Sequence, residues 1–68
     1  MANNMYFHNR IREIRKSKNM TLADISGSIG ISIAYLSDIE RGNRRGSDGT
    51  LKRIADALGV PVADLEVA

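Results

Sequence analysis

Apolar residues recur along this chain at intervals of three and four positions, the spacing of one face of an α-helix. The pattern is clearest in residues 21–42, where one helix face carries Leu22, Ile25 and Ile29. Gly30 follows the last of these, and glycine is the residue that most easily ends a helix in a left-handed conformation. The spacing therefore predicts a short helix that ends at Gly30.

Residues with helix-capping chemistry divide the same segment into two helices. Thr21 and Asp24 stand three positions apart, the spacing of a capping box at a helix start. Ser32 is placed to cap a second helix, which ends at Gly42. The inward face of that helix carries Leu36 and Ile39. A helix, a short turn with a glycine and a second helix form the helix-turn-helix arrangement, whose second helix fits the DNA major groove.

Three further helices are predicted outside this segment. One runs from Phe7 to about Lys18, one begins at Ser47 and ends at Gly59, and a last short one follows Pro61. Their inward faces carry Phe7, Ile11 and Ile14; Leu51, Ile54, Ala55 and Leu58; and Val62 and Leu65. No alternating strand pattern is present. The predicted fold is all-α, a compact bundle of five short helices in one domain over residues 1–68, with residues 1–5 frayed.

Composition narrows the classes of function. The chain has 68 residues, enough for one small domain, with no cysteine and with His8 as its single histidine. We therefore expect no disulfide, no metal site, no cofactor and no small-molecule ligand. No acid and base residues converge in the pattern, so no catalytic residue is assigned and an enzyme is not expected. The apolar runs are too short to span a bilayer, which favours a cytoplasmic protein without a membrane partner.

Charge is distributed unevenly around a net value of +2. Residues 1–20 hold five basic side chains and one acidic one, and residues 41–53 hold the same numbers. Residues 21–40 and 54–68 each hold three acidic side chains and no basic one. Positive charge thus flanks the two-helix segment on both sides, which suits contacts to phosphate groups, although such runs more often mark only a solvated face.

Four stretches together resemble the lambda-repressor/Cro-type helix-turn-helix domains, known as the XRE family. In chain order they are RIREIRKSKNMT, ADISGSIGIS, YLSDIERG and TLKRIADALGVPVADL, and the resemblance covers residues 7–67. It implies a lambda repressor-like DNA-binding domain, a bundle of five helices whose third helix enters the major groove of double-stranded DNA. It also implies binding as a homodimer to a two-fold symmetric operator.

The resemblance assigns roles to individual residues. The groove-facing positions of the third helix are Ser32, Ile33, Ala34, Ser37 and Asp38. The positions that contact the DNA backbone are Thr21, Asn43, Arg44 and Arg45, and the hydroxyl of Tyr35 is a further candidate. Arg15 and Glu40 match a structural ion pair that ties the first helix to the end of the third. Separately, four apolar residues exceed what a short terminal helix needs to bury and are candidates for a dimer interface: Val60, Val62, Leu65 and Val67.

The reading surface departs from the family pattern. Leu22 stands where the family usually has glutamine, and it continues the apolar face of its own helix, so we expect it to be partly buried. Ile33 and Ala34 are suited to thymine methyl groups, and Asp38 is suited to the N4 amine of cytosine. The favoured function is a sequence-specific transcriptional regulator similar to phage Cro-like repressors or restriction-modification controllers. The alternative is an antitoxin-like or adaptor protein-interaction module that uses Leu22, Ile33 and Ala34 as an apolar contact.

Overall fold

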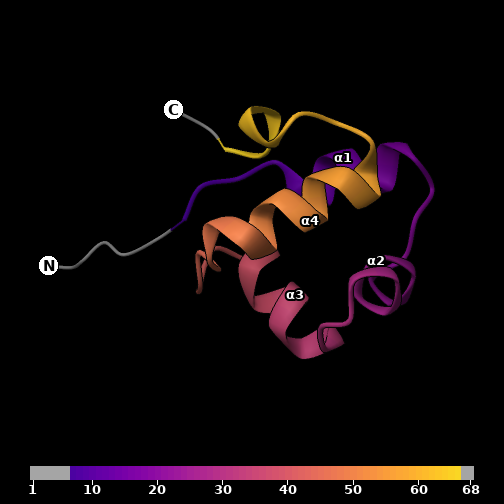
Figure 1. Ribbon diagram of the computed structural model, residues 1–68, viewed down its shortest axis with the longest axis horizontal. Helices are drawn as coiled ribbons and strands as arrows, with labels where there is room; N and C mark the ends of the chain where they lie inside the picture. Colours follow the sequence, from indigo (N-terminus) through magenta and orange to yellow (C-terminus); the bar gives the residue numbers. More distant parts are fainter. Residues whose placement is uncertain (1–6, 67–68) are drawn as a thin grey trace, which may run out of the picture.

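The computed structural model describes residues 7–66, which form four α-helices and one short 3-10 helix (Figure 1). In chain order they are α1 (Ile11–Ser17), α2 (Leu22–Ile29), α3 (Ile33–Glu40), α4 (Asp48–Leu58) and η1 (Val62–Leu65). This confirms the all-α class, since the described part of the chain holds no strand beyond an isolated bridge between Asn9 and Glu66. The expected fraying of residues 1–5 and the candidate interface residue Val67 lie outside the described residues.

Five short helices were predicted, and the last of them is one turn of 3-10 helix, so the structure has four α-helices and not five. Within η1 the amide of Asp64 donates to the carbonyl of Pro61 at 3.0 Å, the three-residue spacing of a 3-10 turn. Only four residues lie in this turn, from Val62 to Leu65. Such a short segment closes one turn and has no length for a further α-helical turn.

The first helix begins at Ile11 and not at Phe7, so that boundary of the prediction was wrong. The segment 7–10 is held outside the helix by its backbone: the Phe7 amide donates to Gly42 at 3.0 Å and the Arg10 amide to Leu65 at 2.7 Å. The side chain of Asn9 accepts from the amide of Ile11, the first residue of the helix, at 3.1 Å. Phe7 still packs against the core, which explains why its spacing fits a helical stripe.

The helix starts follow the predicted capping chemistry. At α2 the Thr21 hydroxyl accepts from the Asp24 amide at 3.0 Å, and the Asp24 carboxylate accepts from the Thr21 amide at 2.8 Å. These bonds, the backbone one first, lower the pKa of Asp24 because they favour its charged form. Ser32 caps α3 and Ser47 caps α4 through first-turn amides. The capping box and both serine caps are therefore confirmed.

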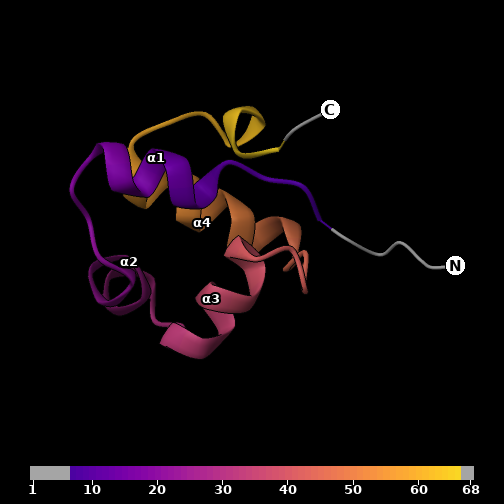
Figure 2. The same cartoon turned by 180° about the vertical axis from the view of Figure 1, so that it is seen from behind.

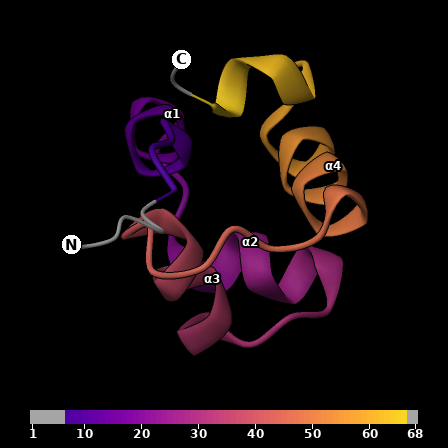
Figure 3. The same ribbon diagram turned by 90° about the vertical axis from the view of Figure 1, so that its left-hand side faces the viewer.

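The helices enclose a single apolar core. Figure 3 shows α1 and α4 on opposite sides, with α2 and α3 below and η1 above. Seen from behind in Figure 2, the start of α3 forms the lower margin of the molecule, away from α1 and η1. The core residues are Ile11, Ile14, Ile25, Ile29, Leu36, Ile39, Leu51, Ile54, Ala55, Leu58 and Leu65. The core is thus built from one face of each element, and it leaves the first turn of α3 at the margin.

Burial corrects the set of candidate interface residues. Leu65 is fully buried within its own chain, so it belongs to the core and has no surface to offer a second subunit. Val60 is half-buried against the core. Val62 is 45% exposed and is the one large apolar side chain of η1 that faces outward. Leu22 is half-buried, as its place on the apolar face of α2 predicts.

Candidate nucleic-acid interface

One side of α3 is buried and the other is open. Leu36 and Ile39 are fully buried, whereas Ile33 is 49% exposed. Ser32 and Ala34 are also exposed, and Ser37 and Asp38 are half-buried. Residues four positions apart on a helix are neighbours, so Ile33 lies beside Ser37 and Ala34 beside Asp38. The five groove-facing candidates therefore form one continuous strip on the open side of α3, which we call the α3 strip.

Asp38 ends the α3 strip and is paired with two arginines. Its Oδ1 lies 2.8 Å from Nη2 of Arg41, and its Oδ2 lies 3.8 Å from Nε of Arg44. Arg41 was counted in the sequence only as part of a basic run. Its three-residue spacing from Asp38 is the signal that identifies the pair, because side chains at that spacing meet on a helix surface.

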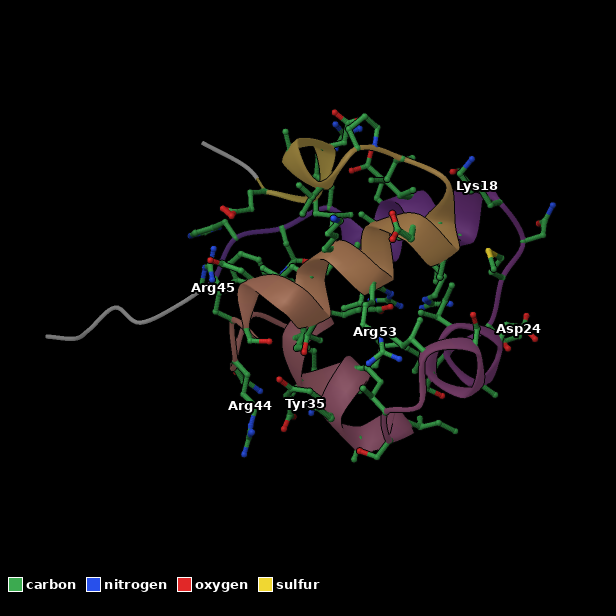
Figure 4. All side chains as sticks on the ribbon, in the orientation of Figure 1. Lys18, Asp24, Tyr35, Arg44, Arg45 and Arg53 are labelled. Atoms are coloured by element: carbon green, nitrogen blue, oxygen red, sulfur yellow. The ribbon has the colours of Figure 1, made fainter. Side chains whose placement is uncertain are left out.

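Arg44 continues the strip onto the loop after α3. Its guanidinium lies 5.5 Å from the centre of the Tyr35 ring, at a distance typical of a cation–π contact. The loop comes close to α3 at Gly46, where φ is +77° and an added Cβ would lie 3.1 Å from Ile39 Cδ1. A residue other than glycine would be strained there. Gly46 thus lets the loop hold Arg44 beside Tyr35, and Figure 4 shows Arg44 pointing outward from that side.

Arg45 points to a different region from Arg44, although the two are adjacent in the sequence (Figure 4). Its guanidinium contacts Asp48 at 2.8 Å and Glu66 at 3.4 Å, and lies 5.9 Å from the Phe7 ring. The hydrogen bond with Asp48 is the main reason why the pKa of Arg45 is raised. The structure therefore separates the two loop arginines. Arg44 lies beside α3, and Arg45 contacts Phe7 and Glu66, the first and last residues that the structure describes.

A buried ion pair fixes the end of α3. Arg15 donates to Glu40 through Nε at 2.7 Å and Nη2 at 3.1 Å, and the two side chains are only 10% and 5% exposed. The hydrogen bonds to Glu40 raise the pKa of Arg15. A third bond runs from Arg15 Nη1 to the Met20 carbonyl at 2.8 Å. The pair expected from the resemblance is thus present, and it joins α1, the turn before α2 and the end of α3.

Two more polar side chains that the sequence did not single out tie the helices around α3. Asn9 donates to the Ile39 carbonyl at 2.9 Å. Arg53, on α4, donates to the Ile29 carbonyl at the end of α2, and Figure 4 shows it directed from α4 toward the corner between α2 and α3. Both bonds join residues more than twenty positions apart, and no local spacing signals such a contact.

A hollow of about 430 Å³ lies beside the α3 strip, between α1, the start of α2 and the second half of α3. Its lining includes Arg12, Leu22, Ser37 and Arg41. Thr21, the cap of α2, is exposed next to it. Positive side chains and the positive end of a helix dipole thus lie together at the edge of the strip.

Residues 7–66 show neither a metal-binding cluster nor a membrane-spanning helix. No group of three or more His, Cys, Asp or Glu side chains there is placed to hold a metal ion. None of the helices described is long and apolar enough to cross a membrane.

The model of the helix-turn-helix family matches residues 11–65 of this chain. The chain belongs to the helix-turn-helix family. This match confirms the resemblance that the sequence motifs indicated, and it covers α1 through η1. The α2 and α3 elements, joined by the turn at Gly30, are the helix-turn-helix of this member.

Similar proteins of this family have names that refer to regulation. The chain is 45% identical over 56 residues to "HTH-type transcriptional regulator DdrOP3" of Deinococcus deserti, covering 82% of this chain but only 43% of that protein. It is 40% identical to "Control protein C.BamHI" of Bacillus amyloliquefaciens, covering 96% of this chain and 84% of that protein. A solved structure, "the master regulator for biofilm formation SinR in complex with DNA", has a TM-score of 0.72 and 33% identity, covering 79% and 87% of the two chains.

Proposed function

We propose that this protein is a sequence-specific DNA-binding regulator of transcription that inserts α3 into the major groove of double-stranded DNA. The observation that carries the proposal is the α3 strip: an open helix side, most exposed from Ser32 to Ala34, bordered by Arg44 and by the hollow that Arg12 lines. Family membership and the solved complex of SinR with DNA support it. On this proposal the protein acts on DNA in the cytoplasm.

The proposed contacts follow from exposure. Ile33 and Ala34 would pack on thymine methyl groups, and Ser32 and Ser37 would hydrogen-bond to base edges or phosphate. Thr21, Asn43 and Arg44 would contact the sugar-phosphate backbone, with Tyr35 holding Arg44 in place. Arg45 is given a structural role instead, because its guanidinium is directed away from the α3 strip, toward Phe7, Asp48 and Glu66.

The separation of the two arginines gives a direct test of this assignment. Arg44→Ala should weaken binding to duplexes of any sequence and flatten the slope of log affinity against log salt by about 1, since one phosphate contact is lost. Arg45→Ala, the matched control with the same charge change, should leave that slope almost unchanged. Fluorescence anisotropy over a salt series measures both. Equal slopes for Arg44→Ala and the unchanged protein would remove Arg44 from the interface.

We also propose that the protein binds its operator as a homodimer through the surface around η1. Val62 is exposed there and borders a hollow of about 630 Å³ that also includes Leu51 and Ala63. Its rim carries both basic and acidic side chains, Lys52 and Glu66 among them, which suits pairing with a second copy of itself. This surface lies on the far side of the molecule from the start of α3 (Figure 1), so a partner there leaves the α3 strip free.

A charge placed on this surface should separate the subunits. Val62→Asp is expected to raise the dimer dissociation constant by roughly tenfold or more, because pairing would bury an unpaired carboxylate. Sedimentation velocity over a concentration series measures the change, with Val62→Thr as a control of similar shape. A chain that stays monomeric at all concentrations before any substitution would contradict the homodimer directly.

The exposed apolar side chains also fit the alternative of a protein-interaction module. Ile33 and Ala34 would suit an apolar partner as well as they suit thymine methyl groups. Arg44 and Arg12 at the two edges of the strip favour a polyanion, and for that reason we favour DNA.

A further inference from the structure

Asp38 is the one acidic side chain of the α3 strip, and each of its carboxylate oxygens faces a different guanidinium group. Oδ1 contacts Arg41 Nη2 at 2.8 Å, and Oδ2 lies 3.8 Å from Arg44 Nε. The Asp38 side chain is 35% exposed and both arginine side chains are 63% exposed. The two cations nearest to the end of the strip are therefore neutralised by a residue of the strip itself.

The backbone keeps this arrangement in place. The Asp38 carbonyl accepts from the amides of Asn43 at 2.9 Å and Arg44 at 3.4 Å, so the loop after α3 folds back onto the same residue. Arg44 is also held over the Tyr35 ring. Asp38 is thus fixed at the junction of the proposed base-reading helix and the proposed phosphate-contacting loop, and its carboxylate lies between the two kinds of contact.

Ion pairs as exposed as these are weak, so a phosphate group can displace the carboxylate from Arg41 and Arg44. Displacement has a cost, because it leaves an unpaired carboxylate beside a polyanion. On a duplex of arbitrary sequence, no DNA group donates a hydrogen bond to the Asp38 carboxylate in place of the two arginines. On a site that presents a cytosine N4 amine at this position, the carboxylate gains a new donor and the cost falls.

We propose that Asp38 is a specificity-determining residue that competes with DNA phosphate for Arg41 and Arg44 and so suppresses binding to non-cognate sequences. The inference rests on the proposed function and deepens it: the same carboxylate that reads a base also restrains the two arginines until that base is found. Discrimination then comes from weakening the wrong complexes as well as from stabilising the right one.

The test compares Asp38→Asn with the unchanged chain on two DNA probes: a duplex of random sequence, and the site that the unchanged chain selects from a random duplex pool. Asp38→Asn should bind the random duplex roughly tenfold more tightly, because both arginines are released. Its salt slope should become steeper by about 1–2 as they reach phosphates. Affinity for the selected site should rise less or fall, so that the ratio of the two affinities drops.

Two controls make the result specific. Asp56→Asn makes the same charge change at an exposed position of α4, outside both the α3 strip and the proposed dimer surface, and should alter neither affinity nor slope appreciably. In a chain that also carries Arg41→Gln and Arg44→Gln, Asp38→Asn should no longer raise the affinity. A gain that persists there would show plain repulsion between Asp38 and phosphate, and would overturn the competition.

The outcomes separate this inference from the proposed function. If the unchanged chain binds no duplex even at low salt, the DNA-binding function fails before any variant is made. If the unchanged chain binds duplex with a normal salt dependence while Asp38→Asn matches Asp56→Asn on both probes, the function stands and the role of Asp38 is overturned.

Discussion

Replacing Arg15 with alanine is expected to remove about 3–5 kcal/mol from the free energy of unfolding, because Glu40 would be left charged and unpaired inside the fold. The Glu40 side chain is only 5% exposed, and both of its oxygens accept hydrogen bonds from the Arg15 guanidinium. The Met20 carbonyl would lose its partner as well. A domain of this size has a total stability of roughly 3–10 kcal/mol, so the variant should be largely unfolded near its working temperature.

Urea unfolding followed by far-ultraviolet circular dichroism measures this loss. The double variant Arg15→Met with Glu40→Leu is the informative control, since it removes both charges and keeps the volume apolar. It should recover much of the stability, though not all, because the Met20 carbonyl still lacks a donor. If Arg15→Ala lowers the free energy of unfolding by less than about 1 kcal/mol, the pair contributes no more than an exposed ion pair does, which would contradict the buried arrangement.

Local chemistry explains why most of the fold could be predicted from the sequence. The starts of α2, α3 and α4 depend on Thr21, Ser32 and Ser47, whose side chains bond amides three positions away. The left-handed residues Gly30 and Asn19 likewise sit where the apolar periodicity stops. These interactions span a few residues, so the order of residues alone specifies them.

The errors arose where the deciding contact is distant in the chain. Phe7 fits a helical stripe, yet its amide pairs with Gly42, and that pairing holds the segment outside α1. Leu65 looked available for a second subunit, but the fold closes over it. A pattern along the chain reports which side of an element is apolar, and not which other element covers that side.

The candidate site likewise combines features that could be predicted with features that depend on contacts between distant residues. Helical periodicity predicted that Leu36 and Ile39 face inward, and the positions of the α3 strip were predicted from the resemblance to the family. The divergence of Arg44 and Arg45 was not predicted: Asp48 lies only three positions after Arg45, but the other contacts of Arg45, Phe7 and Glu66, are distant in the chain. The two ion pairs of Asp38 were missed for a different reason: its carboxylate was predicted to accept from a cytosine amine, and no pairing with Arg41 or Arg44 was predicted.

Exposure of Ile33 without a packing partner in the described fold allows the α3 strip to be tested without disturbing the core. Ile33→Glu is expected to weaken binding to duplex DNA by roughly 100-fold or more, because a carboxylate would replace an apolar contact inside the groove and face phosphates on both sides. The free energy of unfolding should change by less than about 0.5 kcal/mol, as at other exposed positions.

Two other variants show whether the loss of DNA affinity in Ile33→Glu comes from the position of the residue or from the change in net charge. Lys18→Gln makes the same change in net charge on the opposite side of the molecule from α3 (Figure 4), and should reduce affinity only slightly. Ile33→Val keeps an apolar side chain and should retain most of the binding. Anisotropy titrations at one salt concentration, with unfolding curves for each variant, give the answer. If Ile33→Glu binds duplex as well as Lys18→Gln does, α3 does not enter the groove. In that case a protein partner that binds the unchanged chain but not Ile33→Glu would favour the interaction module.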